Sequence, residues 1–227
     1  MKKTSLIGFL VLATFLTGCT SAPATNLPPQ IEIQEGVLPE VPEGKDEKLF
    51  YATLSKEWIE KKHDLNESIE LYKKLIQLFP RNSAPRKEML GYIMNEDLHM
   101  IIRDRKAQEG LEIALKLDKL IPLDFYVQNR IIAAYRIMAE DEIAKKNYQA
   151  AEEILKKKAL SIRFDQEAVR TLIKLRLIQV KEALAQNNQQ QARTYLEEVY
   201  LYTGVEENIL LYKEERKEAE TLAEKLK

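Results

Sequence analysis

Four segments of this chain share one pattern at a spacing of about 41 residues, and this repetition restricts the possible folds more than any other feature. They are residues 63–80, 105–122, 146–164 and 187–204. Each begins with polar turn residues, continues with apolar side chains at helical spacing, and ends at a residue that stops a helix. A small residue lies early in each segment, at separations of 42, 41 and 41: Ser68, Gly110, Ala151 and Ala192. A repeat of this length predicts a series of similar helical units.

The composition around the repeat indicates that its partners are also helices. Residues 45–227 hold only three prolines and three glycines and are rich in Leu, Ile, Ala, Glu and Lys. A longer helical pattern precedes each segment and starts at a residue suited to helix N-termini: Asp46, Ser83 with Pro85 close behind it, Asp124 and Asp165. We therefore expect an all-α domain over residues 46–227 with four antiparallel helix pairs. The small residue would allow the two helices of a pair to approach closely.

A last helix is expected near residues 206–226, after the fourth pair. Its apolar side chains recur at three- and four-residue spacing, opposite a face dense in Lys and Glu. The apolar positions are Val205, Ile209, Tyr212, Ala219, Leu222, Ala223 and Leu226. A helix of this kind is typical of the solvent-facing cap that closes a stack of repeats.

The second helix of each pair resembles that of tetratricopeptide repeats. In that family a small residue is followed by large or apolar residues and then by a terminating proline. The matching positions are Tyr72, Leu75 and Pro80; Ala114, Leu117 and Pro122; Leu155; and Leu196 and Val199. Two departures from the family are the period, about 41 residues instead of 34, and the missing Trp-Leu-Gly-Tyr elements of its first helix. The resemblance implies a tetratricopeptide-like α-solenoid; a HEAT-like stack and irregular helical hairpins are the alternatives.

The N-terminus has the features of an export signal. Met1-Lys2-Lys3 is positively charged, and residues 6–16 are uncharged and mostly apolar. Eleven residues span about 16 Å as a helix, too short for a bilayer core of about 30 Å. The residues that follow, Leu16-Thr17-Gly18-Cys19, resemble the lipobox of bacterial lipoproteins. This resemblance implies that residues 1–18 are removed and that Cys19, the only cysteine, carries covalent lipid; a secretory peptide with a chance cysteine and an uncleaved anchor are the alternatives.

Residues 19–45 are expected to be a flexible, proline-rich linker. They hold five of the eight prolines, and the four glutamates before residue 45 face no Lys or Arg in that stretch. Ile31, Ile33, Val37 and Leu38 leave open a short strand or a partner-binding segment. In Gram-negative lipoproteins an aspartate after the lipidated cysteine favours the inner membrane, whereas this chain has Thr20. The resemblance therefore implies an outer-membrane anchor facing the periplasm, or the outer leaflet in a single-membrane envelope.

The catalytic inventory is thin. His63 and His99 are the only histidines, and their spacing fits no metal site. No phosphate-binding glycine loop, GxSxG or HExxH motif is present. A glycosidase with paired carboxylates is the enzymatic alternative, but no pair stands out. Residues 45–227 carry one more basic than acidic side chain, which gives no electrostatic signature for nucleic acid. We expect a non-enzymatic protein without a metal or a cofactor other than the lipid.

If the tetratricopeptide register applies, the first helices line a binding groove for a protein partner. The positions that it implies are Thr53, Glu57, Tyr92, Asn95, His99, Arg103, Arg136, Glu140, Lys174 and Lys181. The later positions are the more basic, which favours an acidic or C-terminal carboxylate ligand. The alternative is that these are ordinary exposed residues of helices.

The leading functional expectation is a membrane-anchored scaffold that recruits or organises envelope proteins. It resembles the tetratricopeptide lipoproteins that serve outer-membrane β-barrel assembly or act as pilotins for secretins. The alternative is an accessory factor of cell-wall or polysaccharide export that binds a glycan or its synthase. For glycan binding the candidate aromatics are Tyr195, Tyr200 and Tyr202, which could instead pack beneath the last helix.

Overall fold

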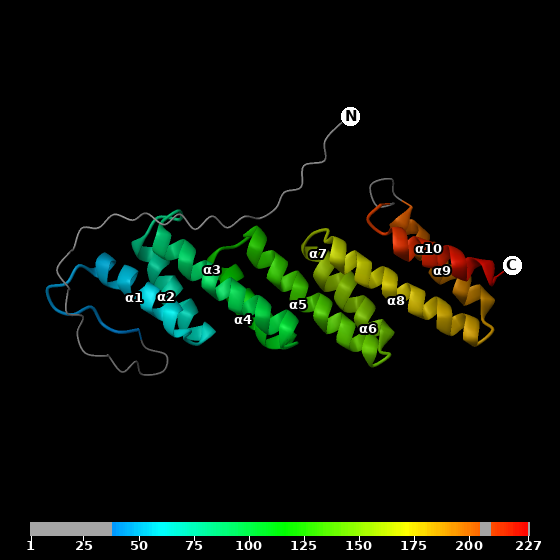
Figure 1. Cartoon of the computed structure of the whole chain (residues 1–227), viewed down its shortest axis with the longest axis horizontal. Helices are drawn as coiled ribbons and strands as arrows, with labels where there is room; N and C mark the ends of the chain where they lie inside the picture. The colour runs from blue at the N-terminus through cyan, green and yellow to red at the C-terminus, as the bar shows by residue number, and fades with distance from the viewer. Residues whose placement is uncertain (1–37, 205–209, 227) are drawn as a thin grey trace, which may run out of the picture. The chain divides into compact units, whose positions relative to one another are not determined.

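A computed structural model describes residues 38–204 and 210–226 of the chain and shows an all-α fold (Figure 1). Over these residues the chain forms nine continuous helices, two of which contain a π-helical segment, labelled η1 and η2. The elements are α1 Glu47–Lys61, α2 Leu65–Leu78, α3 Ala84–Leu98, η1 His99–Arg103, α4 Ala107–Leu120, α5 Phe125–Ala144, α6 Tyr148–Glu153, η2 Ile154–Ala159, α7 Leu160–Ile162, α8 Gln166–Ala185, α9 Gln189–Thr203 and α10 Lys213–Glu224. The expected signal segment, the lipid site Cys19 and linker residues 19–37 lie outside the described residues.

The helices form four consecutive antiparallel pairs and a final single helix, as the sequence predicts. The pairs are α1 with α2, α3–η1 with α4, α5 with α6–η2–α7, and α8 with α9. The second helices coincide with the four repeated segments. The first helices also contact one another in order, α1 with α3, α3 with α5, α5 with α8, and α8 with α10. The second helices α2 and α4 also pack against the first helices that follow them, α3 and α5, so adjacent pairs are joined through both of their helices.

The helix starts follow the predicted caps with one exception. The carboxylates of Asp46, Asp124 and Asp165 accept hydrogen bonds from backbone amides in the first turn of α1, α5 and α8. Ser83 occupies the position before α3, but its side chain makes no capping hydrogen bond. Its Oγ is buried without a partner in the described part of the chain. At α3 the start is instead favoured by Pro85 in the first turn.

The four small residues of the repeat are all buried, in agreement with the packing role expected of them. Gly110 shows the tightest contact, since a Cβ there would lie 2.2 Å from Cγ1 of Ile101. Ser68 uses its hydroxyl instead: Oγ accepts a hydrogen bond from Nε1 of Trp58 and donates one to the backbone oxygen of Asp64. The small residues thus bring paired helices together at their crossing points.

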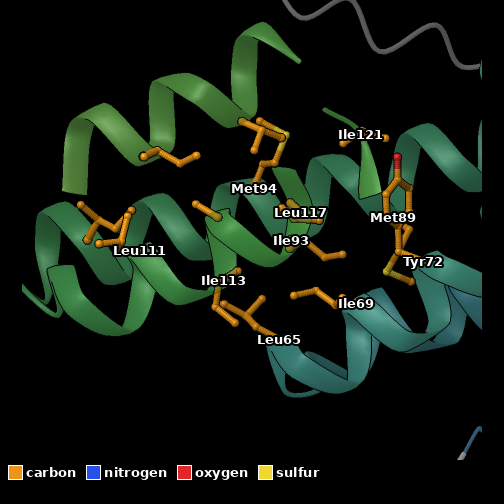
Figure 2. Close-up of a cluster of buried hydrophobic side chains, with 14 of the residues drawn as sticks. Leu65, Ile69, Tyr72, Met89, Ile93, Met94, Leu111, Ile113, Leu117 and Ile121 are labelled. Carbon is orange, nitrogen blue, oxygen red and sulfur yellow. The ribbon is translucent and has the colours of Figure 1, made fainter. Parts of the chain in front are cut away.

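The buried apolar side chains fall into three clusters that follow the order of the helices. The first joins α1 to α5, the second joins α5 to the α6–η2–α7 helix and α8, and the third joins α8 to α9 and α10. Figure 2 shows the first cluster, where side chains of α2, α3 and α4 such as Ile69, Ile93 and Leu117 point into one interior. No single cluster spans the described chain.

The last helix covers the third cluster, as the sequence predicts for a cap. Tyr212 is fully buried, and its hydroxyl donates a hydrogen bond to the backbone oxygen of Gln166 at the start of α8. The helix starts at Lys213, later than expected, and the predicted apolar positions Val205 and Ile209 lie outside the described residues. Tyr195, Tyr200 and Tyr202 are half-buried and pack against this cluster. The cap alternative for these tyrosines is therefore the one that the contacts favour.

The packed region extends further towards the N-terminus than Asp46. Leu38 and Val41 pack against the first cluster, and Pro39 is buried. The hydroxyl of Tyr51 on α1 donates a hydrogen bond to the backbone oxygen of Pro39 at 3.3 Å. No helix within the described ranges is both long and apolar enough to cross a membrane.

Candidate functional site

The ten predicted groove residues lie on α1, on α3 with η1, on α5 and on α8, which are the first helices of the four pairs. These helices contact one another in that order, so the ten positions belong to one continuous row of helices. Five of the ten side chains are exposed: Asn95, His99, Arg103, Lys174 and Lys181. The row therefore presents polar and mostly basic groups to solvent.

All ten residues lie in the described ranges. Among them, only Arg136 and Glu140 bond to each other. Nη1 of Arg136 donates to Oε1 of Glu140 at 2.5 Å, one turn further along α5. Arg105, just after η1, pairs with both Glu140 and Asp141. These bonds hold the turn between η1 and α4 against α5, so Arg136 is less free to bind a ligand than its sequence position suggests.

Several other predicted residues already have partners within the described part of the chain. The hydroxyl of Tyr92 donates to the backbone oxygen of His63 at 2.8 Å, which ties α3 to the turn between α1 and α2. Lys181 pairs with Glu218 of α10 at 2.6 Å, and Arg103 pairs with its neighbour Asp104. Lys174 is exposed and forms no ion pair or hydrogen bond within the described residues, so it is the most available cation of the set.

Asp97 on α3 is a buried acid that the sequence analysis did not single out. It is 0% exposed, and neither carboxylate oxygen has a hydrogen-bond partner in the described part of the chain. Burial raises the pKa of Asp97 to about 7, and the positive charge of Arg130 on α5 partly opposes that rise. Arg130 donates from Nε to the backbone oxygen of Met94 and does not hydrogen-bond Asp97. The signal was visible in the sequence, because Asp97 lies on the apolar stripe that contains Ile93 and Ile101.

Arg176 on α8 is the centre of a second group that the sequence analysis missed. It is 2% exposed and donates to Glu152 of α6, to Glu198 of α9 and to Gln179. Lys156 of η2 lies 2.7 Å from Glu152 and 3.4 Å from Glu198. Burial works to raise the pKa of Glu152, but the hydrogen bonds from Arg176 and Lys156 outweigh it and lower that pKa. The group joins the third and fourth helix pairs through charge.

A shallow hollow of about 710 Å³ lies between α2 and α4, on the second helices. Ile69 and Leu120 give it an apolar part, and its walls carry carboxylates and lysines. The lining residues are Asp64, Asn66, Glu67, Ile69, Glu70, Lys73, Lys116, Lys119 and Leu120. Nζ of Lys116 donates to Oδ1 of Asn66, which joins the two walls. None of the predicted groove residues lines this hollow.

The two histidines occupy unlike places. His63 stacks on Trp58 with ring centroids 4.1 Å apart, and its Nδ1 lies 3.7 Å from Glu67. His99 is exposed at the start of η1. Within the described ranges, no three His, Cys, Asp or Glu side chains are grouped so that they could hold a metal ion. The described side chains of this region form exposed surfaces and ion pairs that join helices.

Searches of protein-family models, of curated proteins and of solved structures found no match to this chain. Its function has to be inferred from the arrangement of its own residues.

Proposed function

We propose that this protein is a membrane-anchored envelope lipoprotein that acts as a non-enzymatic scaffold for other envelope proteins. In this proposal the helix pairs form a tetratricopeptide-like α-solenoid, and the first helices supply the surface that binds a partner. Cys19 carries the lipid, and the linker holds the helical domain away from the membrane. Localisation to the outer membrane, facing the periplasm, is part of the proposal.

The observation that carries the proposal is the contact of the first helices with one another, from α1 through α3 and α5 to α8. A row of parallel first helices is how helical repeat proteins build an extended binding surface. Exposed polar residues of this row, such as Asn95, His99 and Lys174, are available for contacts with a partner. Partly buried ion pairs on the same helices, centred on Arg176 and Arg136, would stiffen the surface and reduce the ordering cost of binding.

The chemistry of the exposed row favours a partner segment with acidic side chains or a free C-terminal carboxylate. Lys174 is exposed and unpaired within the described residues, whereas Arg136 already pairs with Glu140. A carboxylate of the partner could form an ion pair with Lys174, which has none within the described residues. An accessory role in glycan export loses support, because Tyr195, Tyr200 and Tyr202 pack against the third cluster.

In-cell crosslinking of the tagged full chain, followed by mass spectrometry of the copurified membrane proteins, tests the proposal. Lys174→Glu reverses the available charge without breaking an ion pair seen within the described residues. We expect this variant to lose most of the crosslinked partner while its helical content stays unchanged.

Lys119→Glu is the matched control, because Lys119 is also exposed and lies on a second helix, α4. It should crosslink like the wild type. If Lys119→Glu loses the partner and Lys174→Glu keeps it, binding belongs to the hollow between α2 and α4 and the first-helix surface is wrong. A Cys19→Ser variant measures the anchor separately, and its unchanged recovery in the membrane fraction would contradict the lipid assignment.

A further inference from the structure

Large apolar side chains project from the turn before α5, from the first turn of α5 and from the turn before α8. Leu123 is 83% exposed, Phe125 56%, Tyr126 62% and Phe164 61%. Arg163 lies next to Phe164 in the chain. We call these five residues the aromatic tip: Leu123, Phe125, Tyr126, Arg163 and Phe164. Apolar groups gathered at such exposure on one surface commonly mark an interaction site.

Contacts within the aromatic tip hold its two turns together. The rings of Phe125 and Tyr126 pack edge to face with centroids 5.6 Å apart. The guanidinium carbon of Arg163 lies 4.2 Å from the centre of the Phe125 ring, which joins the turn before α8 to the start of α5. Arg81, in the turn before α3, lies 3.5 Å from Asp124. Three successive turns between helix pairs thus meet at this place.

Leu123 has a strained backbone conformation, and its side chain is not buried. Its φ is +62°, in the left-handed region that costs a leucine about 1–2 kcal/mol. A polar residue or glycine would suit the same turn at lower cost. An apolar side chain that is both strained and exposed is consistent with selection for an external contact.

The accessible charge at the aromatic tip is positive. Arg163 forms no ion pair within the described residues, and its Nε is buried without a hydrogen-bond partner there. The side chain of Arg81 is 76% exposed, whereas that of Asp124, the acid with which it pairs, is 14% exposed. The nearby acids are engaged instead, since Asp124 and Asp165 accept hydrogen bonds from backbone amides at the starts of α5 and α8.

We propose that the aromatic tip inserts into the surface of an anionic phospholipid bilayer. Aromatic and leucine side chains would enter the boundary between headgroups and acyl chains, and Arg163 and Arg81 would contact lipid phosphates. The side chains are exposed and do not line the hollow between α2 and α4, so a fluid surface can surround them. The inference rests on the proposed lipid anchor, because eighteen residues separate Cys19 from Leu38, about 56 Å at full extension and enough for the domain to reach the membrane.

The test uses the full chain, purified from membranes and reconstituted into vesicles of phosphatidylethanolamine and phosphatidylglycerol. Leu123→Cys supplies a thiol at the aromatic tip for an environment-sensitive fluorophore. Lys157→Cys supplies a matched probe on η2, where the lysine side chain is 73% exposed. We expect blue-shifted emission at position 123 and, with spin-labelled lipid present, at least about twofold quenching, with neither effect at position 157. Adding Phe125→Ser and Phe164→Ser should reduce the quenching at position 123.

Three results overturn the inference. Equal emission and equal quenching at positions 123 and 157 would mean that the aromatic tip stays in water. A blue shift without quenching by lipid would mean that protein covers it. Quenching that persists undiminished after Phe125→Ser and Phe164→Ser would mean that the rings do not hold the tip in the bilayer.

Failure of the lipid anchor has a different signature. In that case the wild-type chain would react with the fluorophore at Cys19. The aromatic tip is then tested with Leu123→Cys in a Cys19→Ser background, mixed with an excess of the same vesicles: quenching at position 123 supports the inference, and no quenching there overturns it.

Discussion

Asp97 places a carboxylate in a packed interior without a hydrogen-bond partner in the described residues. Four helices pack against α3, namely α1, α2, α4 and α5. Among the charged groups on them, only Arg130 of α5 acts on the pKa of Asp97, and it lowers it, while burial raises it to about 7. The folded chain therefore holds a proton on Asp97 at pH values where the unfolded chain has lost it.

This proton makes stability depend on pH in a direction opposite to that of a salt-bridged acid. Between an unfolded pKa near 3.8 and a folded pKa near 7, the folded state binds more protons, so the free energy of unfolding falls as pH rises. We predict a gain of about 2 kcal/mol from this residue when the pH drops from 7.5 to 5.5. Urea denaturation of wild type and Asp97→Asn at both pH values measures it, and equal pH slopes in the two proteins would contradict the prediction.

Gly110 and Gly91 form a matched pair of helix glycines. Gly110→Ala would place Cβ 2.2 Å from Cγ1 of Ile101, so we predict a loss of about 1–3 kcal/mol from overpacking. Gly91→Ala meets nothing within 4 Å, so we predict a gain of up to about 1 kcal/mol from helix propensity. Thermal denaturation of both variants decides, and comparable shifts would show that Gly110 is not a close-packing position.

For single residues, the sequence predicts the burial of small side chains better than the burial of charged ones. The 41-residue spacing singled out Gly110 and Ser68, because repeated contacts leave a repeated residue. Asp97 and Arg176 do not belong to the repeated pattern, so the 41-residue spacing does not identify them. A charged residue on an apolar stripe signals a buried group. Its partner, however, can lie on a helix far away in the sequence, as Glu198 of α9 lies far from Arg176 of α8.

At the scale of elements, α8 is held to its neighbours on both sides by the Arg176 group. Arg176→Met would leave Glu152 and Glu198 near each other with Lys156 as their remaining cation. We predict a loss of about 2 kcal/mol, below the 3–5 typical of a buried pair because both carboxylates are 32% exposed. Urea denaturation of Arg176→Met measures it. Restoring stability by adding Glu152→Gln and Glu198→Gln would show that uncompensated charge causes the loss, and no recovery would contradict that reason.

The order of the helices and the bounds of the second helices were predicted closely, whereas the last helix starts later than expected and the internal irregularities were not predicted. The second helices agree with the repeated segments within a few residues, because turns and caps are local signals. The π-helical segments η1 and η2 have no such signal. In η1 the amide of Asp104 bonds to the oxygen of His99, five residues back, and the following amide bond, from Lys106, reaches Met100. The widened segment is followed by Arg105, whose partners Glu140 and Asp141 lie on α5, far away in the sequence.

At the scale of the whole described chain, three clusters succeed one another, and α10 closes the last. Tyr212→Ala would remove the buried ring that joins α10 to α8 and its bond to Gln166. We predict that amide hydrogen exchange in α10 and α9 then speeds up at least about tenfold while α1 to α5 keep their protection, since each unit contacts only its neighbours.

Tyr212→Phe is the control for this change. It keeps the ring and removes one hydrogen bond, so a local cost of about 1 kcal/mol is expected. Faster exchange of α1 to α5 in Tyr212→Ala would mean that the chain unfolds as a single unit and that the clusters are not independent.

Every substantial contact in the described chain joins helices of the same pair or of adjacent pairs. A pulling force applied to the two ends would therefore pass through the three clusters in series, with the same tension on each. The weakest junction would yield first, and the others would stay closed until it had lengthened. A chain held at one end by a membrane and at the other by a partner would give way gradually, one helix pair at a time, and could close again when the tension fell.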